Sequence, residues 1–239
     1  MGRGPSIEGR KNAEDARRSK VFTKLIREIT VAARGGADPA GNARLRAGID
    51  KALAANMPKD TIERAVRRGS GAEGADNMQE IRYEGYGPSG VALIIDTMTD
   101  NAQRTVSDVR HALAKHGGNL GTSGSVAFQF HRVGEIVVDT GKPGSEDKVL
   151  EAALDAGADD VQTEGAQTTV LSAPDHLETV RKALVAVGFN PERADVVIRP
   201  ENRVAVSGET AETLRDLIEW LEELDDVQDV YHNAALPEA

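Results

Sequence analysis

Apolar side chains recur at helical spacing through the first 70 residues, and basic side chains occupy the opposite side of the same segments. In "RRSKVFTKLIREITVAARGG", residues 17–36, at roughly 100° per residue, one side of a helix carries Phe22, Leu25, Ile26, Ile29 and Ala33. The opposite side carries the basic stripe, which consists of Arg17, Lys20, Lys24, Arg27 and Arg34. Arg18 stands beside this stripe, and a new helix start at Ser19 would detach Arg17 from it. The pattern predicts an amphipathic helix that turns its cations outward.

Two further segments repeat the arrangement. In "NARLRAGIDKALAAN" the core-facing residues are Leu45, Ile49, Ala52 and Leu53, with Arg44 and Lys51 opposite them. In "PKDTIERAVRRGSG" the inward residues are Ile62, Ala65 and Val66, and the cations are Arg64, Arg67 and Arg68. Cations at a helix C-terminus also favour the helix dipole, so part of this last cluster has a purely structural explanation. Residues 6–69 therefore predict a small helical bundle with basic outer faces.

The charge of the chain is divided unevenly. Residues 1–70 contain sixteen Lys and Arg against eight Asp and Glu, whereas the whole chain has a formal net charge of -10. Such asymmetry favours a polyanion-binding end, although a solvated helical face is the alternative explanation. Residues 201–239 contain eleven Asp and Glu against Arg203 and Arg215. We hypothesise that this acidic region folds over the bundle and competes with nucleic acid.

After a Gly-rich linker, residues 69–79, strand and helix patterns alternate. Their order is β-β-α-β, then β-α-β-β-α-β, then β-α-β, which predicts an α+β fold with helices on one side of antiparallel sheets. Two strands surround the Gly-Pro turn of "YEGYGPSG", and a helix is expected to start at Asp100. Further helices are expected at residues 145–156, 174–187 and 209–224. With aromatic residues at only 3%, the cores must be built mainly from aliphatic side chains.

Known catalytic and metal-binding patterns are missing from the sequence. There is no cysteine, the five histidines are scattered, and neither a phosphate-binding loop nor a dinucleotide fingerprint is present. We therefore expect no catalytic residues, no metal, no cofactor and no enzyme activity. No apolar run is long enough to span a membrane and no secretory signal is recognisable, so we expect a cytoplasmic protein without a membrane partner.

Two glycine-rich loops have alternative interpretations. "YEGYGPSG" is predicted to be a hairpin loop, but Tyr83 and Tyr86 could also stack on bases. In "GNLGTSGSVAFQF" the loop residues Gly121, Thr122 and Ser123 could approach phosphates. Phe128 and Phe130, two residues apart, are expected on one face of a strand, where core packing is favoured over display to RNA.

Long stretches resemble the YebC/PmpR family. They are "DARRSKVFTKLIREITVAARGG", "IDKALAANMPKDTIERAVRRG", "YEGYGPSGVALIIDTMTDNAQRTVSDVRHALAKHGGNLGTSGSVAFQF", "EAALDAGADDV" and "LEELDDVQDVYHN". One departure is the start, where "GRGPSIEGRKN" stands in place of the G-H-S-K-W-x-x-I of many members; Arg3, Arg10 and Lys11 keep it basic. The resemblance implies three domains: the bundle with its linker at 1–79, a discontinuous α+β domain at 80–133 and 204–239, and a ferredoxin-like domain inserted at 134–203.

The family resemblance also implies function. It favours a DNA-binding transcriptional regulatory protein that uses the basic bundle. The alternatives are a ribosome-associated translation factor that contacts rRNA, and a protein–protein adaptor without nucleic-acid contact. The sequence sets neither the choice of DNA or RNA nor the oligomeric state. The expected nucleic-acid-binding residues are Arg10, Lys11, Arg17, Arg18, Lys20, Lys24, Arg27, Arg34, Arg44, Lys51, Arg64, Arg67 and Arg68.

Overall fold

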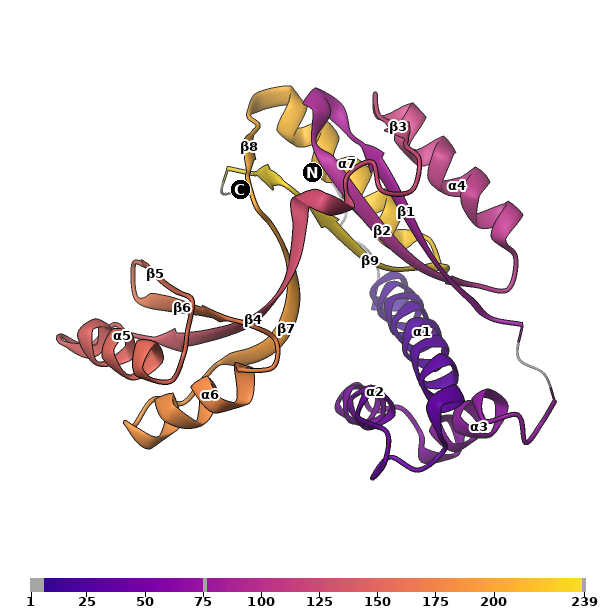
Figure 1. The fold of residues 1–239 in the computed structure, drawn as a ribbon. Helices are drawn as coiled ribbons and strands as arrows, with labels where there is room; N and C mark the ends of the chain where they lie inside the picture. The colour runs from indigo at the N-terminus through magenta and orange to yellow at the C-terminus, as the bar shows by residue number, and fades with distance from the viewer. Residues whose placement is uncertain (1–6, 75–76, 238–239) are drawn as a thin grey trace. The chain divides into compact units, whose positions relative to one another are not determined.

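A computed structural model describes residues 7–74 and 77–237, with side chains from residue 14 onward (Figure 1). The chain folds as two compact units, the first comprising Met1–Val126 with Val204–Ala239 and the second comprising Ala127–Arg203. The division falls at residue 127, whereas we expected it at 134. The reason is that residues from Phe130 onward already pair with residues up to Pro200 in one strand ladder.

The first unit begins with the expected helical bundle. Its helices are α1 (Ile7–Ala32), α2 (Ala43–Ala54) and α3 (Lys59–Gly69). Helix α1 runs unbroken through Ser19, so Arg17 remains on the same helix as the rest of the basic stripe. Asn42 caps α2, because its side-chain oxygen accepts a hydrogen bond from the Leu45 amide at 3.0 Å.

The apolar stripes of the three helices meet in one core. Ile29, Leu45 and Ile62 are buried there, with Phe22, Leu25 and Ile26 packed against them. The expectation for Leu53 was wrong: it is 44% exposed, whereas its neighbour Ala52 is the residue of the last turn of α2 that enters this core. Gly69 lets α3 approach α1 closely, since a Cβ at this position would stand 1.9 Å from the Thr30 carbonyl oxygen.

The rest of the first unit, which we call the body, is a sheet with two helices on one face. The sheet order is β3-β1-β2-β9, with β1 (Gln79–Tyr86), β2 (Ala92–Thr99), β3 (Asn119–Leu120) and β9 (Val227–His232). Helices α4 (Ala102–Lys115) and α7 (Gly208–Glu223) pack on it. A short parallel pair joins β8 (Val204–Ala205) to β10 (Ala234–Ala235). Strand β9 pairs with the central strand β2, so the C-terminal segment completes a sheet begun more than 100 residues earlier.

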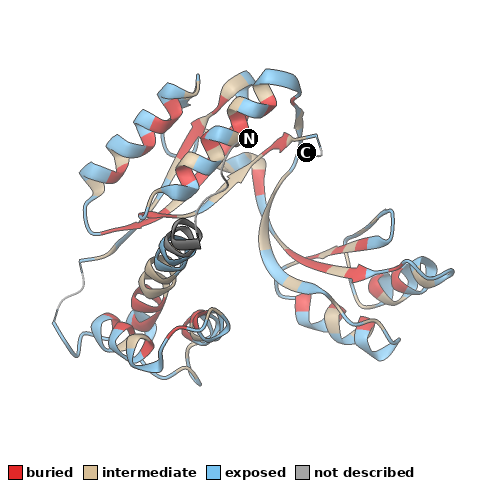
Figure 2. Cartoon of the chain, turned by 180° about the vertical axis from the view of Figure 1, so that it is seen from behind, coloured by how far each residue is buried: buried red, intermediate tan, exposed pale blue. Residues whose placement is uncertain are grey.

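Leu93, Ile95, Leu214 and Leu217 lie in the core between this sheet and its helices, and Figure 2 shows the buried positions along the inner sides of these elements. Helix α4 begins one residue later than we expected. Asn101, not Asp100, is its N-cap, and its side chain accepts from the Arg104 amide at 3.0 Å. Asp100 instead forms an ion pair with Arg104 one turn further along.

The second unit has the order β-α-β-β-α-β. Its elements are β4 (Phe130–Asp139), α5 (Ser145–Asp155), β5 (Asp160–Glu164), β6 (Gln167–Ser172), α6 (Leu177–Ala186) and β7 (Arg193–Pro200). The strands form one antiparallel sheet in the order β5-β6-β4-β7. Ile136, Val138 and Val170 pack with Val149 and Val180 of the two helices in a separate aliphatic core. The predicted α+β fold with antiparallel sheets is confirmed for both units.

The expectation for the two phenylalanines was wrong. Phe130 begins β4 and is buried, whereas Phe128 lies in a 3₁₀ turn at residues 127–129 and is 69% exposed. The turn precedes the strand, so the two rings do not share a strand face. Phe128 therefore does not contribute to a core as we had expected.

Candidate nucleic-acid interface

The middle of the basic stripe contacts an acidic turn of the body. We define the acidic turn as residues 222–226, which end α7 and lead into β9. Lys20 forms an ion pair with the Glu223 carboxylate, and Lys24 Nζ donates to the Glu222 carbonyl oxygen at 2.8 Å. Desolvation by burial is the main effect on Lys24 and lowers its pKa, although the charge of Glu222 opposes this shift. Part of the predicted phosphate-contacting stripe is thus occupied by the protein's own acidic segment.

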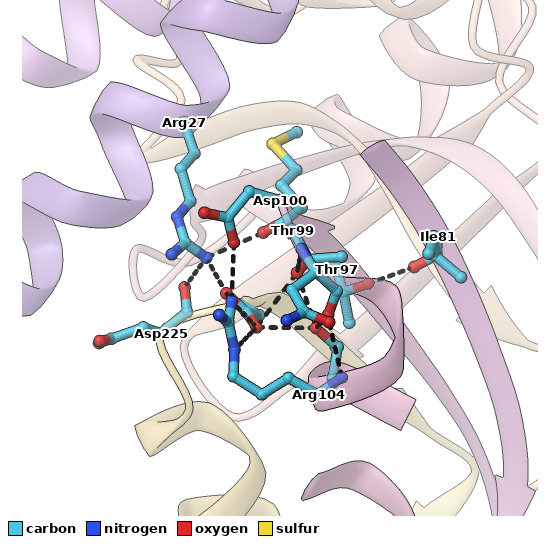
Figure 3. A network of polar contacts seen from close by, with 11 residues as sticks. Arg27, Ile81, Thr97, Thr99, Asp100, Arg104 and Asp225 are labelled. Carbon is cyan, nitrogen blue, oxygen red and sulfur yellow. Dashed lines mark hydrogen bonds and ion pairs between the residues drawn. The ribbon is translucent and has the colours of Figure 1, made fainter. Parts of the chain in front are cut away.

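Arg27 is the most deeply held cation of this contact (Figure 3). Its Nη1 donates to the Met98 carbonyl oxygen at 2.9 Å, to the Asp225 carbonyl oxygen at 2.7 Å and to Asp226 Oδ1 at 2.5 Å. Only 15% of its side chain is exposed. Arg27 therefore ties α1 to β2 and to the acidic turn, which is a structural task and not a surface contact.

Asp226 is the common acceptor of this network. Besides Arg27, its carboxylate accepts from Arg104 Nη2 at 2.9 Å, from Thr105 Oγ1 at 2.7 Å and from Thr99 Oγ1 at 3.3 Å. Burial alone would raise the pKa of Asp226, but hydrogen bonds from Thr105, Arg104 and Arg27 lower it below its usual value. The carboxylate is therefore charged at neutral pH and binds two guanidinium groups at once.

Three further arginines of the predicted set also have partners within the protein. Arg44 of α2 reaches Glu28 of α1 at 2.8 Å and Glu80 of β1 at 2.6 Å, and these two hydrogen bonds raise its pKa. Arg67 pairs with Glu73 at 2.8 Å, and Arg34 donates to the Met78 carbonyl oxygen. Arg44 in particular connects the bundle to the edge of the body's sheet.

Other predicted cations point outward. Five residues are exposed and form no ion pair with any other described residue: Arg17, Arg18, Lys51, Arg64 and Arg68. Arg18 lies 5.1 Å from the Phe22 ring centroid, and Arg64 bonds only to its own helical turn. The side chains of Arg10 and Lys11 lie outside the described residues. The exposed cations therefore lie on the N-terminal half of α1, on α2 and on α3.

A cleft of about 800 Å³ separates the bundle from the open face of the body's sheet. The bundle contributes Lys24, Glu28, Arg44 and Lys51, and the sheet contributes Glu80, Arg82, Asp96 and Asp229. Desolvation, and then the nearby charge of Asp96, raises the pKa of Asp229. Because four acids face four bases, this cleft has no net attraction for a polyanion.

Both tyrosines of the hairpin segment are engaged inside the body. Tyr83 packs against the core under the helices, and Tyr86 Oη donates to the Ser125 carbonyl oxygen at 3.1 Å. The hairpin loop between β1 and β2 is present as predicted, with Ser89 and Gly90 at positive φ. Both residues are half-buried, and each has a contact inside the body.

The second glycine-rich loop is held from beneath by a buried acid. The Glu84 carboxylate accepts from the Gly124 amide at 2.7 Å and from the Val126 amide at 2.8 Å. A Cβ at Gly121 would stand 2.5 Å from Ser125 Oγ, so this glycine serves close packing. Thr122 and Ser123 remain exposed at the tip of the loop.

Within the part of the chain that the structure describes, no group of three or more His, Asp or Glu side chains is placed to hold a metal ion. Nor does any helix of residues 7–74 and 77–237 have the length and apolarity needed to cross a membrane.

Two family models together match almost the whole chain. Residues 4–72 match the model described as the TACO1/YebC protein N-terminal domain, and residues 78–234 match the TACO1/YebC second and third domain. The chain belongs to the TACO1/YebC family.

Relatives in this family are similar over nearly the whole chain. A probable transcriptional regulatory protein of Xanthomonas campestris pv. campestris is 56% identical over 236 residues, covering 98% of this chain and 97% of that protein. One of the same description from Acidithiobacillus ferrooxidans is 56% identical over 230 residues, covering 95% and 91%. The crystal structure of a conserved hypothetical protein from Aquifex aeolicus has 45% identity, a TM-score of 0.77, and covers 94% of this chain and 93% of that one.

Sequence reasoning missed the buried carboxylates of this TACO1/YebC protein, two of which lie in the first unit. Asp226 lies in "LEELDDVQDV", whose five acidic residues are typical of an exposed segment. The only local signal for a buried acid is the change from helix to strand within this stretch. Glu84 lies between two tyrosines in a predicted strand, and strand alternation alone did not distinguish its buried face. In both cases important partners are 40 or more residues away, so no local pattern contains them.

Proposed function

We propose that this protein is a transcriptional regulatory protein that binds DNA through its basic helical bundle. The observation that carries the proposal is the combination of family and charge. Its relatives of 56% identity are described as probable transcriptional regulatory proteins, and its first 70 residues hold twice as many bases as acids in an otherwise acidic chain. Lys and Arg on helices neutralise phosphates without reading sequence, so binding is expected to depend strongly on salt.

The exposed cations are the first candidates for phosphate contact. Arg17 and Arg18 lie in the N-terminal half of α1, while Arg68 precedes Gly69, which abuts Thr30 of the same helix. At 1.5 Å per residue, the thirteen residues from Arg17 to Thr30 span about 20 Å. A duplex presents one charge per roughly 1.7 Å, so about 20 Å of DNA offers roughly a dozen phosphate charges to the two zones. Arg10, Lys11, Lys51 and Arg64 complete this proposed set.

Four other predicted cations have contacts within the protein that their role in binding must accommodate. Arg27, Arg34, Arg44 and Arg67 are each bonded within the first unit, and we propose that they orient the bundle. For the loop residues Tyr83, Tyr86 and Gly121 the internal packing supports a structural role. Thr122 and Ser123, exposed at the loop tip, remain proposed contacts.

We also propose that the second unit is a ferredoxin-like domain inserted into the α+β domain. The support is its β-α-β-β-α-β order and its antiparallel sheet, in which the first strand, β4, lies between the third, β6, and the fourth, β7. In this proposal the protein has three domains and acts by binding, without catalysis.

The test is a salt titration of binding to duplex DNA by fluorescence anisotropy. Replacing Arg17, Arg18, Arg64 and Arg68 by Gln is expected to weaken binding to any sequence and to flatten the log–log salt slope by about 0.9 per lost phosphate contact. The matched control replaces four exposed bases of the second unit, Arg132, Lys142, Lys148 and Lys182, by Gln, with the same change in net charge.

An unchanged affinity and slope in the bundle variant, or an equal loss in the control, would remove the bundle from the binding site. The same titration with structured RNA separates the two nucleic acids. Tighter binding to RNA than to duplex DNA at every salt concentration would replace transcriptional regulation by the rRNA-contacting alternative.

A further inference from the structure

The contact between the basic stripe and the acidic turn weakens along its length. At one end, the side chains of Arg27 and Asp226 are 15% and 8% exposed. At the other end, Lys20 and Glu223 are 37% and 59% exposed. A buried charge pair that also satisfies other hydrogen bonds is costly to break, whereas an exposed ion pair contributes little and is screened by salt. The inner end is therefore fixed, and the outer end can exchange its partners.

The ammonium group of Lys24 can bind an anion in addition to its present acceptor. It donates to the carbonyl of Glu222 in the last turn of α7, where unpaired carbonyl groups carry partial negative charge. The last turn of α7 has no basic residue of its own, so α1 supplies the cation. The bond is to a backbone oxygen and no described carboxylate is bonded to Lys24, which leaves two of its ammonium protons available.

A hollow of about 470 Å³ opens beside these two lysines. Arg17, Lys20 and Lys24 line one side, and Glu222, Glu223 and Asp229 line the other. Gln228 also lines it, and the Gln228 Nε2 donor is buried without an acceptor among the described residues. The hollow has room for a phosphate group, three cations that attract it, and three acids that repel it.

We propose that the acidic turn is a built-in competitor of nucleic acid for Lys20 and Lys24. This inference rests on the proposed function. In the closed state Glu223 and the end of α7 take the place of backbone phosphates. In the open state Lys20 and Lys24 turn to the nucleic acid, while Arg27 stays bonded to Asp226 and keeps the bundle attached.

The negative charges of the acidic turn determine how it changes the affinity for nucleic acid. The acidic turn holds four acids within five residues, so it lowers the affinity of the bundle for any polyanion. A nucleic acid that makes further strong contacts, such as one to Arg17, recovers this loss, whereas a weakly bound one does not. The acidic turn is thus expected to suppress non-specific binding more than tight binding.

The first experiment compares two triple variants of equal charge. The turn variant, E222Q/E223Q/D225N, removes three exposed acids beside the lysines and keeps Asp226. The control variant, E209Q/E212Q/D216N, removes three exposed acids from the first nine residues of α7, none of them in an ion pair with a described residue. The turn variant is expected to bind duplex DNA severalfold more tightly than the control and to steepen the salt slope by about 0.9, because Lys20 loses its carboxylate partner and becomes free to neutralise a phosphate, whereas Lys24 keeps its backbone acceptor. Adding K20Q/K24Q to the turn variant is expected to cancel both effects.

The second experiment needs no nucleic acid. Acetylation of the free protein, read by mass spectrometry, is expected to modify Lys20 and Lys24 more slowly than exposed Lys59 at low salt. High salt or the turn variant is expected to remove the protection of Lys20, whereas in the turn variant Lys24 keeps its bond to the Glu222 carbonyl oxygen. Equal reactivity of the three lysines in wild type would overturn the closed state.

The outcomes separate this inference from the proposed function. If neither wild type nor the turn variant binds DNA or RNA while the lysines are protected, the closed contact exists and the proposed function fails, and with it the competition. If wild type binds but the turn variant equals its charge-matched control, the function stands and the competitor is overturned.

Discussion

Each unit of the protein buries one carboxylate between two arginines, and the two clusters do different work. In the first unit Asp226, 6% exposed, binds Arg27 and Arg104. In the second unit Glu135, 7% exposed, binds Arg193 and Arg199. The chemistry is the same, since a buried carboxylate must be paired to remain charged.

The difference lies in what each cluster connects. Arg193 and Arg199 stand on β7, which is already hydrogen-bonded to β4 beside Glu135, so this cluster reinforces an existing ladder. Arg27 is 199 residues from Asp226 and stands on a helix of the bundle, where backbone pairing with the sheet is not possible. Asp226 therefore joins two layers that share no backbone pairing, and its bond to Arg27 is the most buried ion pair between them.

The strongest test of this difference is Asp226→Ala. The substitution leaves Arg27 and Arg104 facing each other's charge. It also removes the acceptor of Thr99 and one of the acceptors of Thr105. Removing one partner of a buried pair costs about 3–5 kcal/mol. We expect hydrogen exchange to accelerate at the inner turns of α1 and at the start of α4, with the second unit unchanged.

The matched control is Asp225→Ala, because Asp225 meets Arg27 only through its backbone carbonyl and its side chain is exposed. It is expected to leave exchange in α1 close to wild type. If both substitutions accelerate α1 equally, net charge and not the Asp226 network holds the bundle.

The next test is Glu135→Gln in the second unit. The amide keeps the shape but loses the charge, and one arginine must then find another acceptor. Because 55% of Arg193 is exposed, water can replace its bond, and only Arg199, at 22%, is left poorly solvated. We expect a loss of about 1–3 kcal/mol in the unfolding free energy of this unit, measured by exchange in β4 and β7.

The control is Glu201→Gln, since Glu201 is exposed and stands 3.7 Å from His131. It is expected to change nothing measurable. A loss after Glu135→Gln as large as that after Asp226→Ala would mean that burial alone, and not what a cluster connects, determines its importance.

The contrast also explains what the sequence could predict. Residues such as Ile29 of α1 and Ile136 of β4 repeat at regular spacing, so elements and their buried faces follow from local pattern. The family resemblance supplied the discontinuous arrangement, which composition does not contain.

Local sequence pattern could not predict which charged side chains are exposed and which are bonded within the protein. Lys20, Lys24 and Arg27 look equivalent on a helical projection, yet their exposure depends on a turn about 200 residues later. A stripe predicts that cations share a side, but only the tertiary structure determines which of them face the protein. The hypothesis that the acidic C-terminal region folds over the bundle agrees with the contact between the acidic turn and α1. It did not include the burial of one acid, Asp226, in this contact.

The smallest expected effect is at the exposed end of the same stripe, between Lys20 and Glu223. A double-mutant cycle with Lys20→Gln and Glu223→Gln measures their coupling without the contributions of other neighbours. For side chains 37% and 59% exposed we expect about 0.2–1 kcal/mol at low salt, decreasing as salt screens the pair. The same cycle between Arg27→Gln and Asp226→Asn is expected to give a larger coupling that salt changes little, because both groups are shielded from solvent. Equal couplings with equal salt dependence would mean that the contact does not weaken along α1, and that no part of it is free to exchange with phosphate.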